Sequence, residues 1–228
     1  MSNPFETPRQ KLFGVYPAIV REVTDEDRQA RVKVEFPWVD EREGEASAVW
    51  ARLATMMAGA GRGTYFVPEP DDEVLVSFMH GDPSQPVVVG ALWNGVDAPP
   101  EKMDPGGQND VRSVTSRAGH KITFNDGSDR KIELRTNGGH RVELSDASSE
   151  VTVEHSNGAS VRIDSAGTIT VRANAKVKVI APSGATVQAP KVDVNSPIST
   201  FSGIVKAETV ITNMVISSAY TPGAGNVW

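Results

Sequence analysis

Hydrophobic and polar residues alternate along short segments throughout the first 95 positions of the chain. Residues 31–36 alternate strictly, since Val32, Val34 and Phe36 fall on one face of a strand and charged residues fall on the other. Segments of this kind predict five strands, at residues 16–23, 31–36, 49–55, 73–79 and 86–93. Because no helical stripe interrupts them, the pattern predicts a small closed barrel of the OB type.

The second half of the chain contains an internal repeat. The segment Gly119 to Asp126 recurs twenty residues later as Gly139 to Asp146, and a weaker third copy spans Gly158 to Asp164. A short alternating strand begins roughly every ten residues, and glycine-containing corners fall at 125–127, 137–139, 156–158 and 165–167. Farther on, valines alternate and prolines mark the corners, at Val177, Val179, Val187, Val192, Val194, Pro182, Pro190 and Pro197.

Each repeated strand offers only two or three inward apolar side chains, which is too few to enclose a core within one chain. Three chains around one axis would supply the missing faces and form a triangular prism with a dry interior. We therefore predict a homotrimer in which the inward side chains come from Ile122, Phe124, Val142, Leu144, Val177 and Val179. A monomeric β-solenoid or a flat β-meander is the alternative that this pattern leaves open.

Composition divides the chain near residue 110. The first 110 residues carry 19 acidic and 10 basic side chains and ten of the fourteen aromatics. Residues 111–217 contain 15 Val and 9 Ile but only 2 Leu, which favours strands over helices. The segment between them is rich in Pro, Gly and charge. These shifts predict an N-terminal arm at 1–12, a barrel at 13–95, a linker or collar at 96–110, a β-helix at 111–217 and a tip segment at 218–228.

Several function classes are disfavoured by the composition. The chain has no cysteine, so disulfides and thiolate metal sites are excluded, and we expect no cofactor and no catalytic residue. The acidic first half would repel phosphates, and its aromatics are scattered among core positions, so we expect no nucleic-acid binding. The first residues lack a basic segment followed by an apolar one, so we expect assembly in the cytoplasm.

Two loops and three histidines are the remaining candidates for chemistry. The acidic run 40–45 is interpreted as a solvated loop, and the glycine-rich run 59–64 as a flexible barrel loop, since no helix and no Lys-Ser/Thr pair follow it. His120, His140 and His155 share strand parity with inward residues, so rings of imidazoles on a threefold axis are conceivable. All three lie at corners that water can reach, and a hydrated corner role is therefore preferred to metal binding.

Specific motifs resemble a known family. Residues 31–38, 72–78 and 81–95, the last with Gly-Asp-Pro and Trp-Asn-Gly, are similar to the OB domain of phage baseplate assembly protein V and Vgr-type spike proteins. The repeats at Gly119-His120 and Gly139-His140 resemble the neck of that family's trimeric β-helix. The resemblance implies an all-β chain with an OB-type barrel followed by an intertwined trimeric triangular β-helix.

The same resemblance implies a structural role. It suggests the central spike at the baseplate of a contractile tail or injection system, driven through a target-cell membrane when the sheath contracts. A carbohydrate-binding or hydrolysing tail fibre is the alternative, which the scarcity of aromatics after residue 110 disfavours. The short segment before the barrel predicts a separate hub protein. The apolar chain end without metal ligands predicts a PAAR-type tip protein that contacts Tyr220, Val227 and Trp228.

Overall fold

The computed structural model of the protein describes residues 11–39 and 48–218. The chain divides after Val177 into two compact units, which are described separately. Among the described residues the regular structure is β-strand apart from one 3₁₀ turn, Met79–Gly81, and no helix is long and apolar enough to span a membrane. The predicted tip residues Tyr220, Val227 and Trp228 and the acidic loop 40–45 lie outside the described residues.

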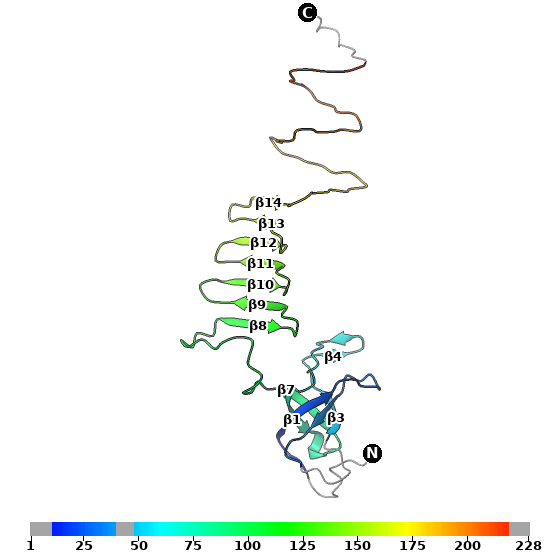
Figure 1. The fold of residues 1–228 in the computed structure, drawn as a ribbon, viewed down its shortest axis with the longest axis vertical. Coiled ribbons are helices and arrows are strands. Elements are labelled where there is room, and N and C mark those ends of the chain that lie inside the picture. Colours follow the sequence, from blue (N-terminus) through cyan, green and yellow to red (C-terminus); the bar gives the residue numbers. More distant parts are fainter. Residues whose placement is uncertain (1–10, 40–47, 219–228) are drawn as a thin grey trace, which may run out of the picture. The chain divides into compact units, whose positions relative to one another are not determined.

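Five strands close the N-terminal barrel, in the order β1-β2-β3-β7-β6 (Figure 1). They are β1 (Val15–Glu22), β2 (Val32–Glu35), β3 (Ala48–Leu53), β6 (Glu73–Phe78) and β7 (Pro86–Ala91). The pairs are antiparallel except for β3 with β7, which is parallel. The five predicted strands and the predicted barrel are confirmed.

The alternation of hydrophobic and polar residues explains which way each barrel strand faces. Val32, Val34 and Phe36 are at most 1% exposed, whereas Lys33 between them forms an ion pair with Glu22 at the surface. Burial of such apolar side chains is the main favourable term in folding. The barrel core consists of Leu12, Ala18, Val20, Val32, Val34, Phe36, Ala51, Val74, Val76, Phe78 and Val88.

The glycine-rich run 59–64 differs from the prediction of a flexible loop. Two short strands, β4 (Ala58–Gly59) and β5 (Arg62–Gly63), pair with each other and form a small hairpin between β3 and β6. Gly63 has a φ of 151°, and a Cβ there would lie 2.5 Å from the carbonyl oxygen of Met57. A glycine at this position is therefore required by the close approach of the two strands.

Seven strands of the repeat form one antiparallel sheet in chain order (Figure 1). They are β8 (Val111–Thr115), β9 (Lys121–Asn125), β10 (Lys131–Arg135), β11 (Arg141–Ser145), β12 (Glu150–Glu154), β13 (Ser160–Ile163) and β14 (Ile169–Arg172). The predicted corners fall between these strands. Within one chain this segment is thus a β-meander in which each strand doubles back on the last, and the faces of the sheet and the outer edges of β8 and β14 are left for other chains.

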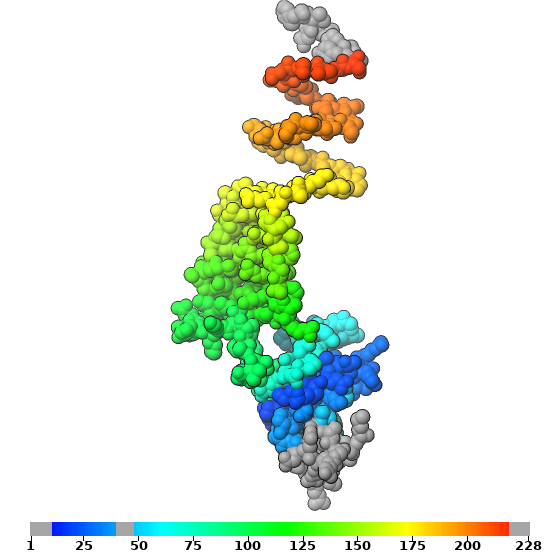
Figure 2. Space-filling view, viewed as in Figure 1, coloured from blue at the N-terminus to red at the C-terminus, as the bar shows by residue number. Residues whose placement is uncertain are grey.

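The second unit, described as far as residue 218, has no regular strand. Figures 1 and 2 show it as an open coil whose successive turns do not touch one another. One backbone hydrogen bond lies within described residues 178–218, from Gly184 N–H to the Ala181 carbonyl. Strands predicted here are absent from the single chain because an extended backbone becomes a strand only when a neighbour supplies hydrogen bonds.

Candidate functional site

One face of the repeat sheet consists almost entirely of aliphatic side chains in two continuous rows. Cross-strand pairs set the rows, because residues directly opposite each other point to the same face. The first row is Val114, Ile122, Leu134, Val142, Val153, Val161 and Val171, and the second is Phe124, Ile132, Leu144, Val151, Ile163 and Ile169. We call these thirteen residues the apolar face.

The apolar face is uncovered in a single chain. Its members are 38–66% exposed, apart from Val142, which is half-buried. A contiguous apolar surface of this size marks an interaction site in a soluble protein. The sheet therefore needs a partner on this side.

The opposite face of the sheet is charged and internally paired. Arg141 of β11 lies 2.9 Å from Glu154 of β12 and 3.0 Å from Glu143, and Lys131 of β10 lies 3.3 Å from the same Glu143. The hydrogen bond with Glu154 raises the pKa of Arg141 above its ordinary value. Such cross-strand pairs keep this face in water, so the two faces of the sheet have opposite preferences.

Four of the six predicted inward residues lie together on the apolar face: Ile122, Phe124, Val142 and Leu144. Val177 and Val179 follow the last strand, and in a single chain they are 60% and 78% exposed. Their inward direction in an assembly stays a prediction. The sequence-based candidates did not include the members of the apolar face on β8, β10 and β12 to β14, although the alternation in those strands carries the same signal.

The three histidines lie in the turns of the sheet. The Nδ1 atoms of His120 and His140 accept the backbone N–H groups of Asn137 and Ser156 in the next turn, at 3.2 and 3.3 Å. The His155 Nδ1 accepts the N–H of Asn157 at 3.1 Å. The rings of His120 and His140 therefore connect successive turns, whereas the ring of His155 orders its own turn.

These hydrogen bonds engage one ring nitrogen of each imidazole with the backbone of a turn. Among the described residues, no group of three or more His, Asp or Glu side chains is placed to hold a metal ion. The geometry fits a turn-ordering role.

Four aromatic side chains of the barrel form one cluster that sequence reasoning did not identify. The rings of Tyr16, Phe36, Trp38 and Phe78 contact one another with centroids 5.1–5.7 Å apart. Phe36 and Phe78 belong to the buried core, whereas Trp38 is 44% exposed. Packing in the closed barrel joins residues far apart in sequence, and the cluster extends the core to the surface rather than forming a row of stacking platforms.

Two family models match the two parts of the chain. The model described as the type VI secretion system/phage-baseplate injector OB domain matches residues 16–93, which contain the barrel. The model described as the phage baseplate V C-terminal trimerisation domain matches residues 131–198, which contain most of the apolar face. The chain belongs to the phage baseplate V and Vgr-type spike family.

Curated relatives of this family member include proteins named as spike proteins and one named as a toxin. The chain is 35% identical over 137 residues to the type VI secretion system spike protein VgrG4b of Pseudomonas aeruginosa, which is 58% of the chain and 16% of the relative. It is 36% identical over 118 residues to VgrG5 of the same organism, or 49% of the chain and 14% of the relative. A match of 37% over 75 residues, 32% of the chain and 7% of the relative, is to the actin cross-linking toxin VgrG1 of Vibrio cholerae. The chain thus spans at most 16% of the length of these relatives.

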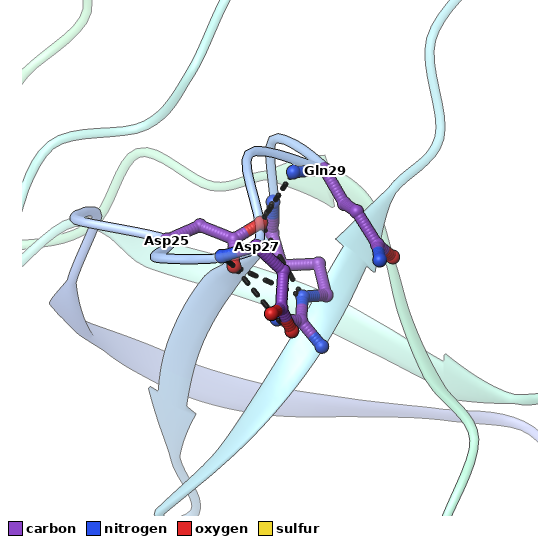
Figure 3. Close-up of polar contacts among 4 residues, drawn as sticks. Asp25, Asp27 and Gln29 are labelled. Carbon is purple, nitrogen blue, oxygen red and sulfur yellow. Dashed lines mark hydrogen bonds and ion pairs between the residues drawn. The ribbon is translucent and has the colours of Figure 1, made fainter.

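The OB barrel of this baseplate V family member has one polar cluster that sequence reasoning missed. The Asp25 carboxylate accepts the backbone N–H groups of Asp27, Gln29 and Arg31 and two hydrogen bonds from the Arg31 guanidinium (Figure 3). The Arg31 side chain, followed by the backbone bonds, lowers the pKa of Asp25 well below its ordinary value. This carboxylate organises the turn between β1 and β2, where Arg28 and Ala30 both have a φ of 55°.

Replacing Asp25 with Asn should lower the melting temperature of the protein by roughly 5 °C, because several donors of the turn lose their acceptor. Tryptophan fluorescence can follow this melting, since three of the four tryptophans lie within residues 38–93. Asp27→Asn is the matched control, because Asp27 is 64% exposed and its side chain pairs with Arg31 alone. Equal effects of the two variants would contradict the assigned role of Asp25.

The stability difference between wild type and Asp25→Asn should also depend on pH. A folded-state pKa below the unfolded value of about 3.9 means that the ionised carboxylate contributes stability above that pH, and the contribution is lost as pH falls toward the folded pKa. Melting curves should therefore converge between about pH 5 and pH 2. A constant difference over that range would show that the charge of Asp25 is unimportant.

Proposed function

We propose that three copies of the chain assemble with their apolar faces turned toward one axis. The trimerisation-domain match over residues 131–198 supports a homotrimer. The uncovered rows of Val, Ile and Leu supply the driving force, since burying an aliphatic side chain contributes about 1.5–3 kcal/mol. Each sheet then forms one side of a triangular prism, with its charged face in water.

We infer that the open coil of residues 178–218 also assembles with the other two copies, in an intertwined form. Its turns leave space between them in the single chain (Figure 2), and two further copies would place strands there. Backbone groups without partners would then find them in the neighbouring chains. The prism is thus formed by sheets held within each chain and, farther along, by strands shared among chains.

The function that this architecture supports best is that of a central spike at the baseplate of a contractile tail or injection system. The observation that carries this proposal is that one chain matches both an injector OB domain and a trimerisation domain. The first match contains the barrel, and the second contains most of the apolar face. We infer a mechanical role without catalysis, in which the spike is driven through the target envelope on sheath contraction. The closed prism suits that role, because few strand edges stay open.

We also propose partners for the spike. A hub protein would bind on the barrel side and a PAAR-type tip protein at the C-terminal end, and the target-cell membrane would be met only during injection. Assembly would take place in the bacterial cytoplasm.

The location of the chain in a purified particle tests this proposal. An epitope tag in the barrel and gold-labelled antibody should mark the axis of the baseplate, with three copies per particle by quantitative mass spectrometry. Deleting the gene should yield particles without a functional baseplate. Label on lateral fibres would contradict the spike role.

A paired substitution tests the inward direction of the coil. Val179→Asp would place three carboxylates around one axis in a dry layer, where desolvation and like-charge repulsion both oppose ionisation. The melting temperature of the trimer should fall clearly, while Lys178→Asp should change it little because that side chain faces water. An equal fall in melting temperature for the two variants, measured by thermal unfolding, would mean that Val179 does not point toward the axis.

A further inference from the structure

The segment between β3 and β6 leaves the barrel as a projecting arm. We call residues 54–67, which include the β4–β5 hairpin, the hairpin arm (Figure 1, cyan). The arm is an ordered structure, since Thr64 N–H donates to the Met57 carbonyl at 3.0 Å and the Thr55 hydroxyl donates to the Thr64 carbonyl at 2.8 Å.

The hairpin arm exposes large apolar side chains that the barrel does not need. Met56 is 90% exposed, Tyr65 79%, Phe66 75% and Met57 51%, whereas the barrel core is already filled by other residues. Holding these side chains in water on a preorganised hairpin is unfavourable. Met, aromatic residues and Arg are also the residue types enriched in the buried centres of protein interfaces.

The charge on the arm indicates what kind of surface it fits. Arg62 is the sole charged residue between positions 54 and 67, and it forms no ion pair within the described part of the chain. The barrel region, residues 13–95, is acidic, with 14 acidic and 7 basic side chains. An apolar arm with one free cation is therefore complementary to an acidic barrel.

We propose that the hairpin arm docks onto the barrel of the neighbouring copy. The inference rests on the homotrimer of the proposed function, which holds three barrels at one end of the prism. A head-to-tail contact of arm on neighbour closes into a ring when the symmetry is threefold. Small residues at the tip, Ala60 and Gly61, allow close approach of the backbones. The arm thereby fixes the barrels to one another, in addition to the contact that joins the repeat sheets.

Site-specific cross-linking tests the docking, since the chain has no cysteine and a single introduced thiol is unique. Ala60→Cys, at the hairpin tip, is labelled with benzophenone maleimide, and sedimentation first establishes the oligomeric state. Irradiation should give a product of twice the 24.4 kDa chain mass on a denaturing gel, with the link in residues 13–95 of the second copy. Glu26→Cys, on the exposed β1–β2 turn, is the control and should give little product.

A second variant distinguishes loss of the arm contact from loss of the trimer. Met56→Ser with Tyr65→Ser in the Ala60→Cys background should abolish the cross-linked dimer and leave the trimer intact, because neither side chain belongs to the apolar face that holds the trimer. A trimer in which the link stays within one chain, or in which Ala60→Cys yields no more product than Glu26→Cys, overturns the docking while the proposed function stands. A monomeric protein overturns both.

Discussion

Replacing Val153 with Asp is expected to abolish the trimer. Val153 lies in the middle of the apolar face, opposite Val142 on β11 and Val161 on β13, and it is 49% exposed in one chain. In the assembly, three carboxylates would converge in a dry layer, where an unpaired buried charge costs on the order of 3 kcal/mol. For the three chains together, this lowers the association constant of the trimer about 10⁶-fold. Sedimentation velocity at micromolar concentration should then show the monomer.

Thr152→Asp is the matched control for this experiment. Thr152 is the preceding residue of β12 and lies on the charged face, between Glu143 and Arg162 on the adjacent strands. A carboxylate there stays in water, with the Glu143 carboxylate on one side and the Arg162 guanidinium on the other, so the trimer should persist. Loss of the trimer in Thr152→Asp and its survival in Val153→Asp would mean that the sheet meets its partners with the charged face.

The coil of residues 178–218 should be protected from hydrogen exchange in the trimer and almost unprotected in a single chain. In one chain its backbone has a single internal hydrogen bond within the described residues. In an intertwined prism, exchange requires opening of a cooperative unit with a stability of about 5 kcal/mol or more, which slows it roughly 10³-fold or more. Peptide-resolved mass spectrometry of wild type and Val153→Asp makes the comparison.

The barrel provides the internal reference for the exchange measurement. Strands β1 and β6 pair with each other within one chain, so peptides from them should be protected from exchange in both samples. Fast exchange of residues 178–218 in the intact trimer, at the rate found in the monomeric variant, would contradict the intertwined form of this segment.

The barrel and the repeat strands were predictable because their signal is local. Apolar residues that alternate with charged ones, as Val32, Val34 and Phe36 do, specify which face of a strand is buried. Glycine-containing corners specify where each strand ends. Ile122, Phe124, Val142 and Leu144 follow from the same period of two. Their uncovered state in one chain could be expected from the strands' length.

The remaining features depend on contacts that no local pattern records. Asp25 owes its role to backbone N–H groups of a turn whose shape comes from Arg28 and Ala30 at positive φ, and neither residue type signals that conformation. Tyr16, Trp38 and Phe78 meet only because the barrel closes. The run 59–64 has the composition of a loop, yet the close approach that Gly63 permits turns it into a hairpin.

In the proposed trimer, two further copies of the same chain cover the apolar face of each chain. Sedimentation equilibrium of the purified protein tests this directly, because it gives mass independently of shape. We expect a single species of three times 24.4 kDa that persists on dilution into the nanomolar range. A species of 24.4 kDa at micromolar concentration would contradict it.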